Sequence, residues 1–159
     1  MQKNVWLIVG GGSTLVASLL HIAIIVGGAE WYRFFGAGEQ MAQMAEQGSS
    51  YPAQITGVIA LVLFSWALYA FSGAGLVPRM PFARIAMVLI ATVFMLRGLF
   101  GIPAVLYFDT PYFQELGHSL TFMLVSSGIC LVLGICYAVG TWQVWPSLKK
   151  KGGSDIPVY

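Results

Sequence analysis

Four long apolar segments alternate with polar connections along the chain. Each approaches or exceeds the roughly 20 residues that a helix needs to cross the hydrocarbon core of a bilayer. We therefore predict four membrane-spanning helices over residues 5–28, 54–75, 83–106 and 118–144. The expected fold is all-α, an integral membrane antiparallel four-helix bundle that forms one domain over residues 1–146 and is followed by a tail over 147–159.

The connection between the first two segments has a different pattern. It begins with aromatic residues over 31–35, a composition typical of the membrane–water interface. Farther along, Met41 and Met44 fall on one side of a helix, and Glu39 and Gln43 fall mostly on the other. This segregation predicts a short interfacial helix over about residues 38–47, lying along the periplasmic surface of the membrane.

The composition excludes an ordinary soluble domain. Of the 159 residues, 58% are hydrophobic and only 9% are charged, whereas about 25% charge is usual in soluble domains. Lys3 before an apolar segment superficially resembles the start of a cleaved signal peptide. The apolar part of a signal peptide spans only about 7–15 residues, however, so we expect the first segment to be retained as a membrane helix.

The basic residues determine the expected orientation. They fall mainly in the N-terminus, the second connection and the C-terminal tail: Lys3, Arg79, Arg84, Lys149, Lys150 and Lys151. Four spans place these regions on one side, which the positive-inside rule makes cytoplasmic. The acidic residues, Asp155 apart, fall in the opposite connections. The net charge of +2 is therefore a topology signal, and nucleic acid is not an expected partner.

Three of the predicted helices have a face of small and weakly polar residues, which allows close helix packing in lipid. These faces contain Gly11, Thr14, Ser18, His21 and Gly28 in the first helix, Gln54, Leu61, Ser65, Tyr69 and Ser72 in the second, and Ser127, Cys130, Gly134, Tyr137 and Thr141 in the fourth. The simplest interpretation is that these faces pack against one another inside the bundle.

Arg97 interrupts the third apolar segment and gives the main functional hypothesis. It follows Arg84 by 13 residues, which is roughly 20 Å along a helix axis and places it in the outer part of the membrane. Chain topology brings five other polar residues to a similar depth: His21, Glu30, Gln54, Glu115 and His118. An arginine at this depth is costly in lipid, so we expect it to face the interior and to meet a partner, with Glu30 first and Glu115 second.

Three roles for this cluster stay open. The six residues form a water-accessible pocket for a ligand, or Arg97 only locks the helices or reaches the headgroups, or His21 and Glu30 form a proton path. Paired histidines also suggest haem, but His21 and His118 are expected at different depths. Met41 and Met44 suggest copper(I), although an apolar helix face explains them more simply.

No catalytic residues and no metal site are predicted. Cys130 and Cys136 are six residues apart and point to different faces of a helix, which fits neither a redox pair nor a metal site. The serine, histidine and carboxylate residues show no arrangement typical of a nucleophilic enzyme.

Three stretches of the chain are similar to known sequences. Residues 21–39 (HIAIIVGGAEWYRFFGAGE), 93–103 (VFMLRGLFGIP) and 126–143 (SSGICLVLGICYAVGTWQ) resemble a group of small four-span inner-membrane proteins of proteobacteria. The resemblance implies a bacterial inner membrane location and implies no activity.

The leading hypothesis is a membrane protein that binds a small amphipathic ligand or a lipid in an outward-facing pocket around Arg97, with transport as one use and with no cofactor. The alternative is an accessory or structural subunit, in which the Arg97 network only stabilises the bundle. Its small-residue faces would then bind a second copy or another membrane protein. A third hypothesis is a redox subunit that holds haem or quinone.

Overall fold

The computed structural model describes residues 4–107 and 120–146. All regular structure in these residues is helical: α1 (Val5–Gly27), α2 (Ala29–Phe34), α3 (Glu39–Glu46), α4 (Tyr51–Gly73), α5 (Ala83–Tyr107) and α7 (Leu120–Val144). The helices α1, α4, α5 and α7 are long and apolar enough to cross a membrane. The all-α fold and the four long apolar helices are thus confirmed.

The two ends of the described chain are joined through Asn4. Its side chain caps α1 by accepting a hydrogen bond from the backbone N–H of Leu7 at 3.0 Å. The same side chain donates to Gln143 Oε1 at 2.9 Å and to the carbonyl of Gly140 at 3.4 Å. One residue therefore starts α1 and ties it to the last turns of α7.

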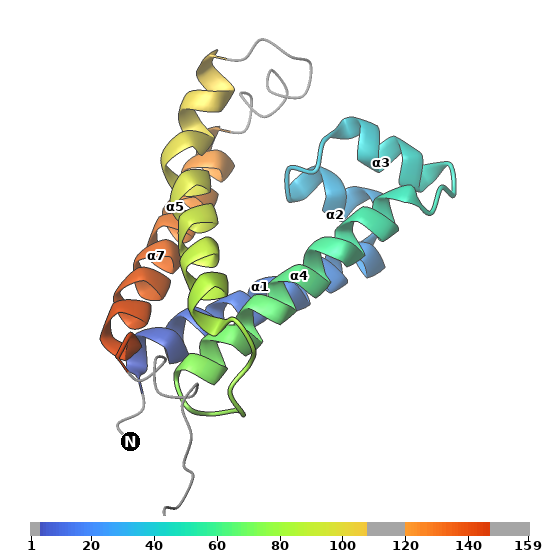
Figure 1. The fold of residues 1–159 in the computed structure, drawn as a ribbon. Coiled ribbons are helices and arrows are strands. Elements are labelled where there is room, and N and C mark those ends of the chain that lie inside the picture. Colours follow the sequence, from blue (N-terminus) through green and yellow to red (C-terminus); the bar gives the residue numbers. More distant parts are fainter. Residues whose placement is uncertain (1–3, 108–119, 147–159) are drawn as a thin grey trace, which may run out of the picture.

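The long helices pack as two pairs, α1 with α4 and α5 with α7 (Figure 1). Alanines line the α4 side of the first pair, and Ser18 of α1 donates a hydrogen bond to the carbonyl of Ala60 at 2.7 Å. Glycines allow close approach in the second pair. A Cβ atom on Gly98 would lie 2.9 Å from the backbone nitrogen of Leu131, so the two backbones nearly touch.

The pairs share a core near the end that contains Asn4. This shared core contains Leu63, Ala70, Ile90, Ala91, Phe94, Leu133 and Tyr137. At its edge the rings of Trp66 and Phe94 meet edge to face, with centroids 5.3 Å apart. The hydroxyl of Tyr137 is within hydrogen-bonding distance of the carbonyl of Trp66 at 3.0 Å and Thr14 Oγ1 at 3.3 Å, which connects three helices. Beyond this core the two pairs diverge (Figure 1).

The connection between α1 and α4 forms a helical hairpin from α2 and α3. Tyr32 and Ala42 are buried against Ile24 at the end of α1. The expected helix over about 38–47 is present as α3, but Ala42, rather than Met41 or Met44, is its fully buried residue. The sequence did not predict α2. The position of this hairpin relative to a membrane stays a prediction.

The expected packing face of the second apolar segment is only partly present. Leu61 is 65% exposed, and Ser65 satisfies its hydroxyl within α4 by donating to the carbonyl of Leu61 at 2.9 Å. The residues of α4 that are buried are mainly small and apolar: Pro52, Thr56, Ala60, Leu63, Ala67, Ala70 and Ser72. The expected faces of the first and fourth segments are largely buried, with His21 and Cys130 half-buried. A serine that bonds its own helix can face lipid, so polarity alone did not identify the packing face of α4.

Candidate functional site

Arg97 belongs to one stripe of α5, together with Ile90, Phe94 and Gly101. These positions are separated by four, three and four residues, so they lie on the same side of the helix. Ile90 and Phe94 are 2% and 6% exposed because they pack in the shared core. Arg97 follows Phe94 by three residues, so it lies one turn beyond the shared core. On this side of the core the two helix pairs diverge (Figure 1). The stripe therefore directs Arg97 toward the space between the pairs.

The local contacts of Arg97 are few. Its Nη1 donates to the hydroxyl of Ser127 on α7 at 3.3 Å, and Ser127 is 1% exposed. The guanidinium lies against Gly101, where a Cβ atom would collide with Nη1. Arg97 itself is exposed within the described chain. Among the residues that the structure describes, no carboxylate forms an ion pair with it.

His21 lies on the α1 side of the same space. Along α1, Thr14 is bonded to Tyr137, and Ala17 packs against the shared core. His21 is one turn farther on, and its Nδ1 lies 2.8 Å from the carbonyl of Ala17. If this nitrogen donates the hydrogen bond, Nε2 is left as an acceptor on the half-buried ring. Arg97 and His21 thus each stand one turn beyond the shared core, on facing pairs.

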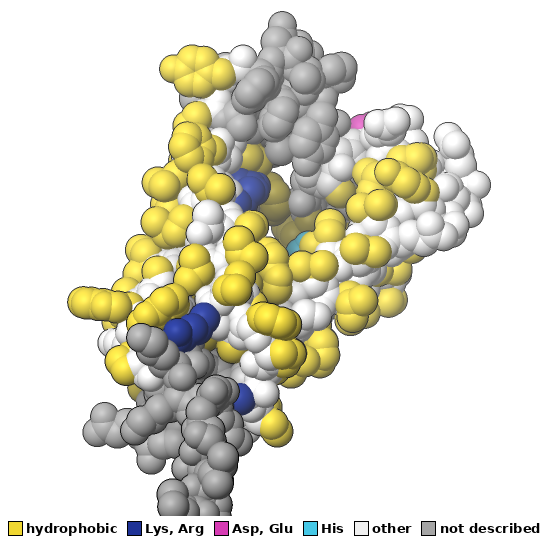
Figure 2. All heavy atoms as spheres, viewed as in Figure 1, with side chains coloured by type: hydrophobic (Ala, Val, Ile, Leu, Met, Phe, Trp, Pro, Cys, Tyr) yellow, Lys and Arg dark blue, Asp and Glu magenta, His cyan; other side chains and the backbone are white. Residues whose placement is uncertain are grey.

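We call the space between the diverging pairs the interpair opening. Figure 2 shows it as a hollow with basic and histidine side chains on its walls. Its inner end is the shared core, which contains Phe94 and packs against the ring of Trp66. The opening therefore combines an apolar floor with one positive charge.

The other expected pocket residues are not all brought to this opening. Glu30 has a side chain that is 85% exposed and pairs with Arg33 at 3.1 Å, so it is not the partner of Arg97. Gln54 is exposed and donates to Ser50 Oγ at 3.2 Å in the first turn of its own helix. Glu115 and His118 lie outside the described residues. The structure thus places Arg97 and His21 beside one opening (Figure 2), whereas the contacts of Glu30 and Gln54 in the described residues are local ones.

A charged cluster at the α2–α3 hairpin was not predicted. Arg33 forms ion pairs with Glu30 at 3.1 Å, Glu39 at 2.8 Å and Glu46 at 2.7 Å. Hydrogen bonds from Arg33 lower the pKa of the Glu39 carboxyl below its ordinary value and raise the pKa of the guanidinium. Because one cation joins three carboxylates across two helices, the cluster has a structural role that holds α2 against α3. The helical spacing of Glu39 and Glu46, opposite the apolar face of α3, was the available signal.

The described residues contain no group of three His, Cys, Asp or Glu side chains that could hold a metal ion. Cys130 and Cys136 are free thiols, half-buried and buried. The haem hypothesis requires His118, which lies outside the described part of the chain. No known family, curated protein or solved structure matches this chain.

Proposed function

We propose that this is a multi-pass membrane protein that binds an anionic amphiphile in the interpair opening. The observation that carries the proposal is Arg97, a charged residue within the apolar span Ala83–Gly101. Its single hydrogen bond within the described chain goes to the neutral hydroxyl of Ser127. A charge costs about 2.5–3.5 kcal/mol at the bilayer centre on insertion scales and less toward the outer part, where Arg97 is expected, and an anion bound beside it offsets that cost.

The chemistry of the walls suggests the class of ligand. A guanidinium has five donors in a planar fork, and Arg97 uses one of them on Ser127, so a phosphate or carboxylate fits the remaining donors. The rings of Trp66 and Phe94 at the inner end suit an apolar chain. His21 adds a nitrogen that accepts or donates according to its protonation. An acidic headgroup on an apolar body satisfies all three features.

The proposed setting is the bacterial inner membrane, with both termini in the cytoplasm and the α2–α3 hairpin on the periplasmic surface. The distribution of basic residues supports this orientation. Only 28–33% of the most apolar part of each long helix is buried within the chain, and the remaining surface suits contact with lipid. On this orientation, the interpair opening faces the periplasmic leaflet, and the four spans form a bundle that is open on that side.

The test uses purified protein in dodecyl maltoside, with dodecyl phosphate as the anionic probe. We expect the probe to raise the unfolding midpoint of the wild type and to change its tryptophan fluorescence, because Trp66 packs against Phe94, which is one turn from Arg97. Arg97→Met should abolish both responses. Arg79→Met is the matched control, since Arg79 is an exposed arginine in the connection between α4 and α5. A parallel titration with dodecanoate shows whether the site prefers a phosphate or a carboxylate headgroup.

Two results would contradict the proposal. Equal responses from the Arg97→Met and Arg79→Met variants would mean that the probe acts through general charge. A wild type that does not respond, together with an Arg97→Met variant that dissociates from a native partner or loses stability, would favour the accessory-subunit hypothesis.

A further inference from the structure

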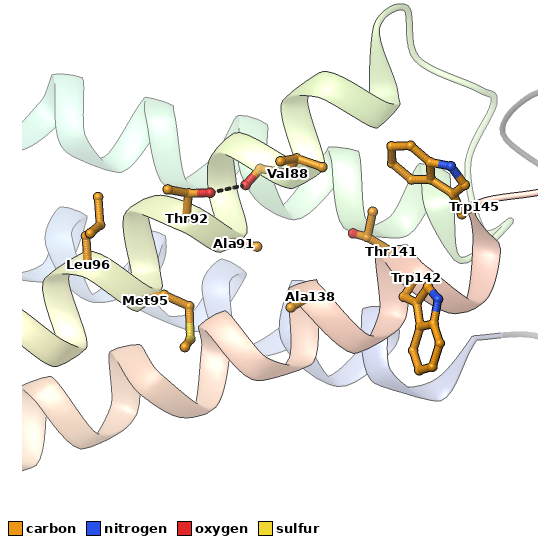
Figure 3. A pocket seen from close by; sticks show the side chains of 9 residues that line it. All are labelled: Val88, Ala91, Thr92, Met95, Leu96, Ala138, Thr141, Trp142 and Trp145. Carbon is orange, nitrogen blue, oxygen red and sulfur yellow. Dashed lines mark hydrogen bonds between the residues drawn. The ribbon is translucent and has the colours of Figure 1, made fainter.

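A groove runs between α5 and α7 near the end that contains Asn4, separate from the interpair opening. Its volume is about 630 Å³, within the range of about 300–1,000 Å³ typical of ligand sites. Figure 3 shows the residues that line it: Val88, Ala91, Thr92, Met95, Leu96, Ala138, Thr141, Trp142 and Trp145. The lining is mainly apolar and comes from the two helices of one pair. We call it the α5–α7 groove.

The position of the groove matches one leaflet of a membrane. Trp142 is 79% exposed and Trp145 is 43% exposed, and exposed tryptophans at a helix end are typical of the headgroup level. From there the groove follows α5 from Val88 to Leu96. Eight residues rise about 12 Å, and half of a hydrocarbon core is about 15 Å. The groove is therefore long enough for most of one acyl chain in one leaflet.

A positive charge stands at the tryptophan end. The guanidinium of Arg84 lies 4.9 Å from the centre of the Trp145 ring, and its Nη2 donates to the carbonyl of Trp145 at 2.9 Å. The Nε atom of Arg84 is buried and has no hydrogen-bond partner among the residues that the structure describes. Arg84 therefore has donors left over beside the groove, at the level where a phosphate headgroup would lie.

The two hydroxyl groups of the lining differ. Thr92 Oγ1 donates to the carbonyl of Val88 at 2.9 Å and is satisfied within its helix (Figure 3). Thr141 is 4% exposed, and its Oγ1 has no hydrogen-bond partner within residues 4–107 and 120–146. A buried hydroxyl without a partner is uncommon, because leaving it unsatisfied is unfavourable. The Thr141 hydroxyl and Arg84 Nε are therefore two polar groups at the tryptophan end of a groove whose lining is otherwise mainly apolar.

We propose that the α5–α7 groove binds one acyl chain of an anionic phospholipid from the leaflet next to the N-terminus, with the lipid phosphate at Arg84. The charge of Arg84 selects the anionic headgroup, and the apolar lining holds the chain. A second transmembrane helix would also fit an apolar groove, but it would need an acidic side chain at the level of Arg84, whereas an anionic lipid carries its charge at the headgroup level where Arg84 lies. The lipid site and the interpair opening lie on different faces of α5, so this proposal does not rest on the proposed function.

The first test measures lipid preference by native mass spectrometry. The protein is released from micelles that contain equal amounts of phosphatidylglycerol and phosphatidylcholine with identical acyl chains. We expect the wild type to retain phosphatidylglycerol with a preference of about tenfold, because both lipids offer a phosphate to Arg84 but the choline cation of phosphatidylcholine opposes the positive charge of the guanidinium. Arg84→Gln should remove this preference and Arg79→Gln should keep it, since Arg79 is exposed and is not part of the groove.

The second test fills the groove. Ala138→Phe places a ring in the lining, and we expect it to lower the retained lipid of both headgroup types. Val132→Phe is the matched control, because Val132 is 59% exposed on the same helix and does not line the groove. It should retain lipid like the wild type.

Three outcomes would overturn the proposal. Equal loss of the phosphatidylglycerol preference in the Arg84→Gln and Arg79→Gln variants would show that the preference comes from the overall positive charge of this surface and not from a site at Arg84. Equal lipid retention by the Ala138→Phe and Val132→Phe variants would show that the groove is not where the chain binds. A dimer of the wild type that Ala138→Phe alone dissociates, with lipid retention unchanged, would assign the groove to a second copy of this chain.

Discussion

At the scale of single residues, Arg97 depends on two small neighbours. Ser127 accepts its hydrogen bond at 3.3 Å, and Gly101 leaves the space in which the guanidinium lies. This glycine is needed for space and not for backbone freedom, because it lies within a regular helix. The position of the charge is therefore set by a missing side chain one turn away.

This dependence predicts that Gly101→Ala weakens ligand binding without unfolding the protein. The added Cβ would displace Nη1, which can move because it ends a flexible side chain, but the Arg97–Ser127 hydrogen bond would break. We expect the apparent affinity for dodecyl phosphate to fall about tenfold in a fluorescence titration. The unfolding midpoint should change little, because alanine is favoured over glycine in a helix by about 1 kcal/mol.

Gly128→Ala is the control for this prediction. A Cβ on Gly128 meets nothing within 4 Å, so the variant gains the same helix propensity and leaves Arg97 in place. Equal affinities for the two variants would show that the position of Arg97 does not govern binding.

Helix spacing predicts that Arg97 and His21 lie at one depth, but it does not predict which other polar residues meet them. Depth follows from 1.5 Å of rise per residue, and this placed Arg97 and His21 at one level. Which polar side chains meet Arg97 depends also on whether residues nearby in the sequence bind those side chains instead. The rise along a helix does not reveal this. Glu30 is held by Arg33 three residues away, and Gln54 bonds Ser50 four residues away. Both side chains therefore bond to neighbours in their own segments, and within the described residues neither pairs with Arg97.

At the scale of the elements, the α2–α3 hairpin is held by one cation and a small apolar contact. Arg33 on α2 bonds Glu39 and Glu46 at the two ends of α3, and Tyr32 and Ala42 form the contact between the helices. These ion pairs are partly exposed, so their strength depends on salt and on pH.

We predict that acid loosens this hairpin. The pKa of the Glu39 carboxyl is lowered in the folded state from an ordinary value of 4.5, so its contribution to stability is fully present above that pH. The contribution is lost as the pH falls through the lowered pKa, because protonation of the carboxyl removes the ion pair with Arg33. Hydrogen exchange should show lower protection of α3 at about pH 3 than at about pH 6, after correction for the intrinsic rates.

Two variants separate this mechanism from general acid unfolding. Arg33→Gln should lower protection of α3 at both pH values and remove most of the difference between them. Glu30→Gln should retain the difference, because the Glu30 side chain is 85% exposed and the other two ion pairs remain. An unchanged pH dependence in the Arg33→Gln variant would rule out the cluster as the cause.

The bounds of the long helices could be predicted to within a few residues, because long apolar runs determine them. The predicted span over 5–28 is observed as Val5–Gly27, and the span over 83–106 as Ala83–Tyr107. Rotation about the helix axis was harder to predict. In α4 the polar Ser65 bonds its own backbone, and Ala67 and Ala70 are buried instead. The short α2 was missed because its aromatic residues suit an interface in any conformation.

At the scale of the whole molecule, one shared core joins two helix pairs at a single end. Tyr137 connects α7 to α1 and α4, and Trp66 meets Phe94 where the core ends. Beyond this point the pairs diverge, which creates the interpair opening (Figure 1). The α5–α7 groove lies outside one pair at the joined end. If the chain spans the bilayer as proposed, the two candidate sites face opposite leaflets, so one molecule would contact lipid-like ligands on both sides.

This arrangement makes orientation the decisive whole-molecule prediction. Gln43 is exposed on α3, just before α4, and Leu76 is 44% exposed just after it. The 23 residues of α4 rise about 35 Å, enough to separate the two positions by a membrane.

We expect Gln43→Cys to react with an impermeant maleimide in cells with a permeabilised outer membrane, and Leu76→Cys to react only after the inner membrane is opened. Leu76→Cys leaves Arg79 and Arg84 in place, so the charges that direct insertion are unchanged. The wild type, with half-buried Cys130 and buried Cys136, provides the background labelling. The reverse pattern, with Leu76→Cys labelled first, would invert the topology and assign the interpair opening to the cytoplasmic leaflet.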